Sequence, residues 1–266
     1  MNISFYTATT GAIQQQDRLD VHANNIANVN TFGFRAKQPS FSQLMTGPVV
    51  GIEEELARGV GARMEDAATD FRQAGLTGTE RSLDYAINGS GFFGLLDPST
   101  GEISYTRDGS FTLSQMKANE TVQITEPADP NDPNAAPTTR TEIQEVDHWY
   151  LSDGMGRLVL GNDGRRIEVD AETAEQAVIP ALPVGVFDFI NHDGMLSLGD
   201  NRLIPVEKNG GVGLGSGEAV QGYLELSNAD LANELAKVIE SQRSFQYMLR
   251  MITTSDEIET TVNNLR

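Results

Sequence analysis

The sequence predicts an α+β protein with a helix at each end of the chain and a central all-β region of short strands. Apolar residues follow a heptad spacing near both termini, whereas the middle of the chain is rich in turn residues. With 266 residues, the chain is long enough for one large domain or two modest ones. We therefore expect two long helices, far apart in sequence, on either side of a β-rich domain.

The first expected helix covers residues 3–29. Its apolar or small residues recur in steps of 4-3-4-3-4-3, which is a heptad seam weakened by polar members. The seam consists of Phe5, Thr9, Ala12, Gln16, Leu19, Ala23 and Ile26. A second stripe, which runs beside the first, consists of Tyr6, Ile13, Asp20 and Ala27. Because Asn and Gly tolerate positive φ, the helix should end within residues 28–33.

The second expected helix starts at the S-x-x-D signal of Ser227 and Asp230 and contains no Pro or Gly up to Arg266. It carries two seams on different faces, so more than one face requires a partner. The N-terminal helix can cover only one of them, and the other then needs a second chain. The first seam is Leu231, Leu235, Val238, Gln242, Phe245, Leu249 and Ile252, and the second is Met248, Met251, Ser255, Ile258, Val262 and Leu265.

Between the helices, short apolar runs alternate with turn residues, including Asp-Gly pairs at 108–109, 153–154, 163–164 and 193–194. We expect a helical unit of residues 1–35 and 225–266, an extended or irregular connector at 36–75, and a β-rich outer domain at 76–224. Residues 126–139 contain four prolines and almost no apolar surface. They predict an exposed loop within an acidic, Pro-rich insertion at about 116–147.

Composition excludes several classes of partner and site. The net charge of −19 is concentrated in the middle of the chain, which argues against nucleic acid or an anionic membrane as partner. No apolar run approaches the roughly 20 residues needed to span a bilayer, so direct membrane insertion is not expected. The N-terminal segment lacks the basic and apolar regions of a cleavable secretory signal. Without cysteine, thiolate metal sites and cysteine nucleophiles are excluded.

Residues that could support catalysis or cofactor binding are few. His22, His148 and His192 are scattered without a paired-ligand spacing. The Gly-rich segment 210–217 lacks the GK[ST] ending of a phosphate-binding loop and is expected to be a connector. We therefore expect no catalytic residue, no metal site and no cofactor. An acidic hydrolase is disfavoured, whereas a secreted β-domain adhesin or binding module stays open as an alternative.

Residues 23–35, ANNIANVNTFGFR, place four asparagines at a helix end, followed by Gly33 between two phenylalanines. Two interpretations follow from the residues alone. One is a helix cap with Phe32 and Phe34 in the core, and the other is an elbow whose amides bond neighbouring chains.

The same segment resembles the N-terminal signature of flagellar rod and hook proteins. Residues 83–93 and 105–111 resemble the next two blocks of that family. Residues 221–228, continued by 242–245 and 254–257, resemble its C-terminal block. Four blocks in the right order span nearly the whole chain, which chance does not explain.

The resemblance implies a structural subunit of the bacterial flagellar basal-body rod, in a rod that spans the periplasm or cell wall. It implies polymerisation into a hollow helical tube that transmits torque and carries the export channel. The terminal helices would pair as an antiparallel coiled coil lining the channel, with the β domain outside. The implied partners are further copies of the chain, other rod and hook axial proteins, and the flagellar type III export apparatus. The choice between a proximal and a distal rod subunit stays open, and a hook-type subunit is the alternative.

The residues expected at the assembly interface come from the two helices and the segment after the first helix. They are Phe5, Leu19, Asn24, Asn25, Ile26, Asn28, Gly33, Phe34, Leu231, Leu235, Val238, Gln242, Arg243, Phe245, Leu249, Ile252 and Ile258.

Overall fold

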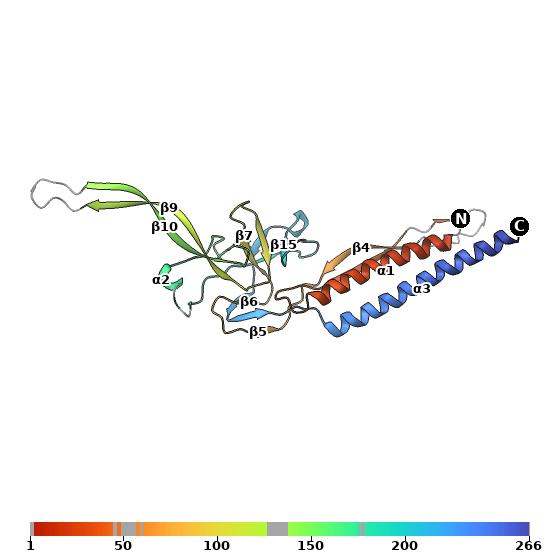
Figure 1. Ribbon diagram of the computed structural model, residues 1–266. Helices are drawn as coiled ribbons and strands as arrows, with labels where there is room; N and C mark the ends of the chain where they lie inside the picture. The colour runs from red at the N-terminus through yellow and green to blue at the C-terminus, as the bar shows by residue number, and fades with distance from the viewer. Residues whose placement is uncertain are drawn as a thin grey trace, which may run out of the picture.

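The computed structural model of the chain describes residues 3–44, 47–48, 57–58, 61–126, 138–174, 176 and 179–265. The molecule is elongated, with two long helices at one end, a β-rich body in the middle, and a two-stranded ribbon projecting from the other end (Figure 1). This arrangement confirms the predicted α+β class, with one helix from each end of the chain.

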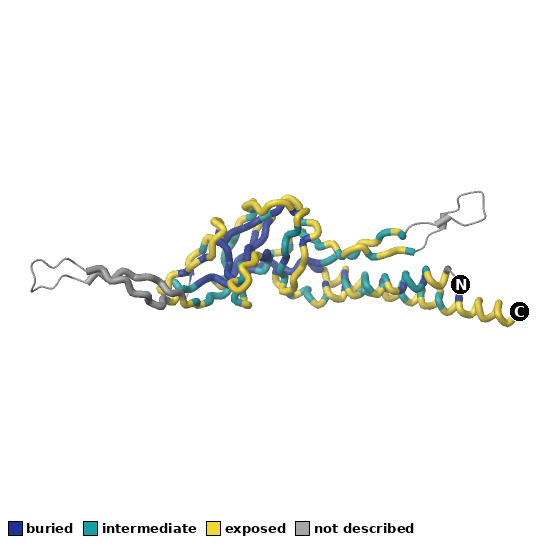
Figure 2. Tube along the Cα trace, turned by 90° about the horizontal axis from the view of Figure 1, so that it is seen from above, coloured by how far each residue is buried: buried dark blue, intermediate teal, exposed yellow. Residues whose placement is uncertain are grey.

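Helices α1 (Ile3–Ala27) and α3 (Leu231–Asn264) lie side by side and run in opposite directions, so that both termini lie at the same end of the molecule (Figure 1). α3 begins at Asp230, whose side chain accepts hydrogen bonds from the backbone N–H groups of Ala232 and Asn233. α3 is nine residues longer than α1, and its last turns extend beyond α1 with an exposed surface (Figure 2).

A second pairing accompanies α1 on its other side. Strands β1 (Lys37–Gln43) and β4 (Ala62–Thr69) form an antiparallel ribbon that packs along α1, and the backbone N–H of Met64 donates to the Gln14 side chain. Beyond them, β2 (Gly47–Pro48) pairs with β3 (Ala57–Arg58). The segment we expect to be a connector therefore extends back along the helix pair as paired strands.

The body contains a ten-stranded sheet with the central order β12-β10-β11-β7-β8-β15-β14, to which β9, β13 and β16 are attached. Its strands are β7 (Phe92–Leu96), β8 (Ile103–Thr106), β9 (Thr112–Glu126), β10 (Thr138–Ser152), β11 (Leu158–Val159), β12 (Glu168–Val169), β13 (Val186–Phe189), β14 (Leu196–Gly199), β15 (Arg202–Ile204) and β16 (Val212–Leu214).

Two small sheets connect the body to the helices. They pair β17 (Glu218–Gln221) with β6 (Tyr85–Asn88), and β18 (Tyr223–Glu225) with β5 (Leu76–Gly78). A four-residue helix, α2 (Ala171–Ala174), and a 3-10 turn, η1 (Glu207–Asn209), complete the described elements. Because β18 leads into α3 and β5 follows β4, these sheets fix where the helix pair leaves the body.

The core lies in the body, where most of the buried residues gather (Figure 2). One cluster centres on Tyr85, Phe93 and Phe111, and a second contains Phe92 and Tyr105. The rings pack edge to face, as for Phe93 and Phe111 with centroids 5.2 Å apart. The body thus has an apolar core of its own, separate from the helix pair.

The predicted acidic loop at about 116–147 is wrong over most of its length. β9 and β10 pair in continuous register from Thr112 opposite Ser152 to Glu126 opposite Thr138. The segment alternates β-branched residues with polar ones on both sides of the prolines, a pattern that favours strands. The four prolines lie in residues 127–137, which are outside the described residues.

Candidate assembly interface

The turn after α1 joins the helix pair to the body through a buried polar cluster. Asn25 is fully buried, and its amide donates to the backbone carbonyl of Lys37 at 2.8 Å and to Glu234 at 3.1 Å. The amide oxygen accepts from the backbone N–H of Lys37 at 2.9 Å. Glu234, near the start of α3, also bonds His22 Nδ1 at 2.6 Å and Lys237 Nζ at 3.2 Å. One carboxylate therefore ties together α1, the start of β1 and α3.

The charge state of Glu234 follows from these contacts. Burial raises the pKa of its carboxyl, but hydrogen bonds from Asn25, His22 and Lys237 lower it by more, so that the pKa lies below its ordinary value. The carboxylate is thus held ionised in the folded chain. Its partners on α1 are more than 200 residues away in sequence.

A second buried cluster centres on Glu225 at the end of β18. One carboxylate oxygen of Glu225 pairs with Arg35 at 2.8 Å and the other with Arg107 at 3.0 Å. The carboxylate also accepts a hydrogen bond from the backbone N–H of Ala74 at 2.8 Å. Burial lowers the pKa of the Arg107 guanidinium, while Glu225 opposes that shift. A buried carboxylate between two arginines holds the end of the turn to the body, since removing Glu225 would leave two buried guanidinium groups without their carboxylate.

Gly33 lies where the turn meets the body. Its φ is +66°, and its N–H donates to the backbone carbonyl of Glu225 at 2.8 Å. A Cβ at this position would lie 2.4 Å from the backbone nitrogen of Asp108, closer than real side chains approach. Gly33 therefore combines a positive φ, which Gly tolerates, with a close contact that only Gly permits.

The facing sides of the helices follow heptads that mix large apolar side chains with small and polar ones. Among the buried and half-buried positions, six on α1 step 4-3-4-3-4 and seven on α3 step 4-3-4-3-4-3. Gly11 leaves room for Met248, because a Cβ there would lie 3.2 Å from the sulfur. The positions are Ala8, Ala12, Gln15, Leu19, His22 and Ile26 on α1, and Glu234, Val238, Ser241, Phe245, Met248, Ile252 and Ser255 on α3.

Large apolar side chains remain exposed on the outer sides of both helices. On α1 they are Phe5, Tyr6 and Ile13. On α3 they form two groups, one of Leu231, Leu235, Ile239 and Leu249, and one of Tyr247, Met251, Ile258, Val262 and Leu265. An exposed apolar surface of this extent is typical of a protein–protein contact.

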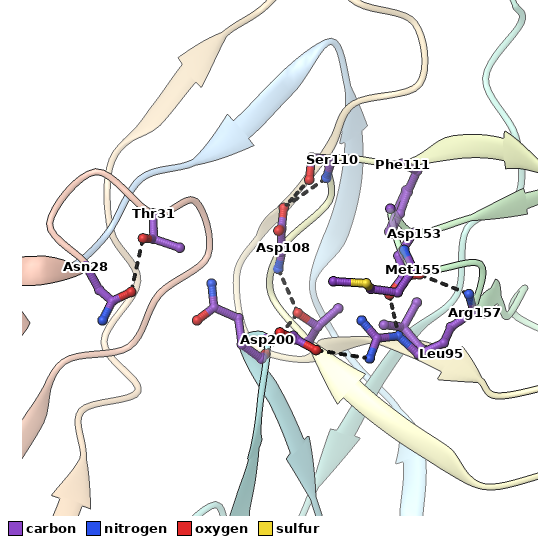
Figure 3. A pocket seen from close by; sticks show the side chains of 13 residues that line it. Asn28, Thr31, Leu95, Asp108, Ser110, Phe111, Asp153, Met155, Arg157 and Asp200 are labelled. Atoms are coloured by element: carbon purple, nitrogen blue, oxygen red, sulfur yellow. Dashed lines mark hydrogen bonds and ion pairs between the residues drawn. The ribbon is translucent and has the colours of Figure 1, made fainter. Parts of the chain in front are cut away.

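A cavity of about 470 Å³ lies between the turn after α1 and the body (Figure 3). Its carboxylates are already engaged: Asp153 accepts from the Arg157 guanidinium, and Asp200 lies 3.6 Å from the same group. Asp108 accepts from the backbone N–H and hydroxyl of Ser110. These contacts hold together the loops that surround the cavity.

Among the described residues, no group of three or more His, Asp or Glu side chains could hold a metal ion. Likewise, no helix in the described part of the chain is long and apolar enough to cross a membrane.

Comparison with known proteins accounts for this arrangement. Three family models match: "flagella basal body rod protein" over residues 5–35, "flagellar hook protein FlgE/F/G D1 domain" over 86–127, and "flagellar basal body rod FlgEFG protein C-terminal" over 220–265. The flagellar basal-body rod protein FlgG of Buchnera aphidicola is 31% identical over 96% of both chains. FlgG of Bacillus subtilis is 30% identical, with 99% of this chain and 98% of the relative covered. The flagellar hook-basal body complex protein FlhP of Bacillus subtilis is 28% identical, with 99% of each chain covered.

This chain belongs to the flagellar basal-body rod protein family. It is a structural subunit of the flagellar basal body and not an enzyme. The first and last family models coincide with α1 and with β18–α3, the parts of this rod protein that carry the polar clusters and the exposed apolar groups.

The structure separates the predicted interface residues of this rod protein into three sets. Asn25, Gly33 and Phe34 are buried within the chain, which leaves them little surface for another subunit. Their hydrogen bonds or packing serve the junction between helix and body instead. Asn24 is exposed, while Asn28 is half-buried and donates to the Asn24 carbonyl at 2.9 Å, which is a local cap.

The second set lies on the facing sides of the helices and the third on the outer sides. Leu19, Ile26, Val238, Phe245 and Ile252 are half-buried, whereas Phe5, Leu231, Leu235, Gln242, Arg243, Leu249 and Ile258 are exposed. The predicted seam on α1 includes Phe5, Gln16 and Ala23, which are exposed, whereas the facing positions include Ala8, Ser241 and the His22–Glu234 pair. The sequence signal for these four residues is weak, because only their contacts across the helix pair give them a role.

Proposed function

We propose that this rod subunit polymerises through α1 and α3 into a hollow helical tube. In the tube, the two helices of each copy form an antiparallel coiled coil that lines a central channel, and the body lies outside. The observation that carries the proposal is the pair of apolar groups on α3 that α1 leaves uncovered. Facing heptads on two oppositely directed helices support the coiled coil.

The energetics favour association of many copies over a stable free helix pair. The facing side contains polar members, including Gln15 and Ser241, so a single pair is weakly held. Burying one exposed Leu or Ile contributes about 1.5–3 kcal/mol, and α3 has several. Because the exposed groups of α1 and α3 differ, the contact between copies is heterologous, which generates a filament where rotation does not close a ring.

We further propose that the subunit is exported through the flagellar type III apparatus and assembles with other rod and hook axial proteins. Relatives named as basal-body rod proteins over nearly the whole length support a rod rather than a hook subunit. An adhesin would have no use for exposed apolar groups on both terminal helices.

Assembly of the purified chain tests the proposal. The parent chain should form tubes visible by electron microscopy, and Leu249→Asp should abolish them, because it places a charge where a second copy packs. Leu249→Met, which conserves volume and polarity, should still assemble. Normal tubes from Leu249→Asp, or no tubes from the parent at any concentration, would overturn the proposal.

A further inference from the structure

We infer that the outer stripe of α1 in one copy packs antiparallel against the outer stripe of α3 in a second copy, with Ile13 opposite Met251 and Tyr6 opposite Ile258. The inference rests on the proposed polymer and names the contact between its subunits. Here the α1 outer stripe is Tyr6, Ile13 and Asp20, and the α3 outer stripe is Tyr247, Met251, Ile258, Val262 and Leu265.

The α1 outer stripe is a repeat of seven residues on the side of α1 left open by its neighbours. α3 and the β1–β4 ribbon pack against α1 on other sides. Tyr6 and Ile13 are 50% and 54% exposed, and Asp20 is exposed as well. Two apolar side chains followed by a carboxylate at heptad spacing define a directional pattern.

The α3 outer stripe continues past the end of α1. Within one chain, Gly11 lies near Met248, and Arg18 and His22 pair with Glu240 and Glu234, so that residue numbers across the pair sum to about 258. In this register the N-terminal end of α1 lies beside residue 255 of α3. Residues 256–264 then extend for about 13 Å, and no helix in the described part of the chain lies beside them.

The exposed apolar side chains on that extension belong to the same stripe as those before it. Met251 and Ile258 are 55% and 54% exposed, and Val262 and Leu265 are exposed too. The α1 of a second copy, packed on this stripe, would therefore cover apolar surface along the part of α3 that pairs with its own α1 and also on the extension.

Charge and the spacing of the apolar side chains select the register together. With Ile13 opposite Met251 and Tyr6 opposite Ile258, Asp20 lies at Ser244, next to Arg243. Arg243 is exposed and has no ion-pair partner among the residues that the structure describes. The alignment therefore joins apolar to apolar and carboxylate to cation at heptad spacing.

Other alignments match less well. In a parallel arrangement, with Ile13 opposite Ile258 and Tyr6 opposite Met251, Asp20 would lie opposite Leu265. This places a carboxylate against an apolar side chain. On the other apolar group of α3, placing Ile13 opposite Leu249 brings Asp20 to Gln242 and Tyr6 to Asp256. This second arrangement keeps Asp20 next to Arg243 but sets Tyr6 against the carboxylate of Asp256. Each of the two therefore places a carboxylate against an apolar or aromatic side chain.

The inferred register has a measurable consequence. Residue numbers across the two copies sum to 264, against about 258 within one chain. The difference of six residues corresponds to an offset between neighbouring copies of about 9 Å along the helix axis.

Because the chain has no cysteine, mixtures of single-cysteine chains test the contact between copies. Tubes assembled from Ile13→Cys and Met251→Cys chains should form disulfide-linked dimers under mild oxidation. As a matched control, Ile239 is similarly exposed at 52% but lies in the other apolar group. The Met251→Cys mixture should give about tenfold more dimer than an Ile13→Cys and Ile239→Cys mixture, since a disulfide needs close Cβ atoms.

The outcomes separate the two ideas. If tubes form and the Ile239→Cys mixture gives as much dimer, the inferred register is wrong and the proposed polymer stands. If the parent chain forms no tubes, the proposed function fails and the register with it. If only the cysteine chains fail to assemble, charge reversal decides: Asp20→Arg and Arg243→Asp should each weaken assembly, and the double variant should restore it. Absence of restoration would overturn the inference.

Discussion

Substitution of Gly33 tests how the helix pair is fixed to the body. In Gly33→Ala, the new Cβ would lie 2.4 Å from the backbone nitrogen of Asp108 and 2.5 Å from the carbonyl carbon of Arg107. A left-handed conformation costs an alanine about 1–2 kcal/mol. The collision with backbone, which cannot rotate away, adds about 1–3 kcal/mol as overpacking. We therefore expect the free energy of unfolding to fall by about 2–5 kcal/mol.

Gly164→Ala is the matched control for this change. Its φ of +72° is close to the +66° of Gly33, but no atom lies within 4 Å of the added Cβ. It should cost only the conformational penalty of about 1–2 kcal/mol. Replacing Gly by Ala also restricts the unfolded chain, which raises the free energy of unfolding slightly. This gain is common to both variants and cancels when they are compared.

Urea denaturation followed by the fluorescence of Trp149, the single tryptophan, measures both variants. Gly33→Ala should also reduce tube formation, because relief of the collision must tilt the helix pair relative to the body. Equal losses of stability in the two variants would refute the reasoning, since the close contact with Asp108 would then have no energetic effect.

Three further results are expected. Glu225→Gln should lower the free energy of unfolding by about 3–5 kcal/mol in urea, because two buried arginines lose their carboxylate; unchanged stability would contradict this. Since the folded pKa of Glu234 is depressed, the stability it contributes is present above the ordinary carboxyl pKa and falls as pH drops through the folded value. As the pH is lowered from 7, the helix signal in circular dichroism should fall earlier in the parent than in Glu234→Gln, with each chain compared to its own signal at pH 7. Replacing residues 127–137 with a short Gly-Ser link should leave motility intact, and loss of rods at unchanged export would show that these residues make a contact.

The local sequence pattern predicts part of the fold. Heptad spacing located both helices, and the S-x-x-D signal placed the start of α3 at Asp230, where its side chain caps the helix. Asn and Gly after α1 indicated the turn, and Gly33 has the expected positive φ. These features depend on residues close together in sequence.

Contacts between distant segments could not be read from the sequence. Glu225 and Glu234 resemble ordinary surface carboxylates, yet each binds side chains more than 100 residues away. Two asparagines, Asn25 and Asn228, likewise bond backbone groups of other elements. The long β9–β10 ribbon was also missed, because the prolines near its centre outweighed the β-branched residues around them.

Amide exchange, compared between monomer and assembled tubes, most directly tests the claim that the helices assemble the rod. In a verified monomer, residues 4–27 of α1 and 231–262 of α3 should exchange faster than the core strands of the body, because small and polar residues interrupt the apolar contacts between the two helices. On assembly, α1 and α3 should gain strong protection while the body changes little. Full protection of both helices in the monomer, with no gain in tubes, would contradict the account.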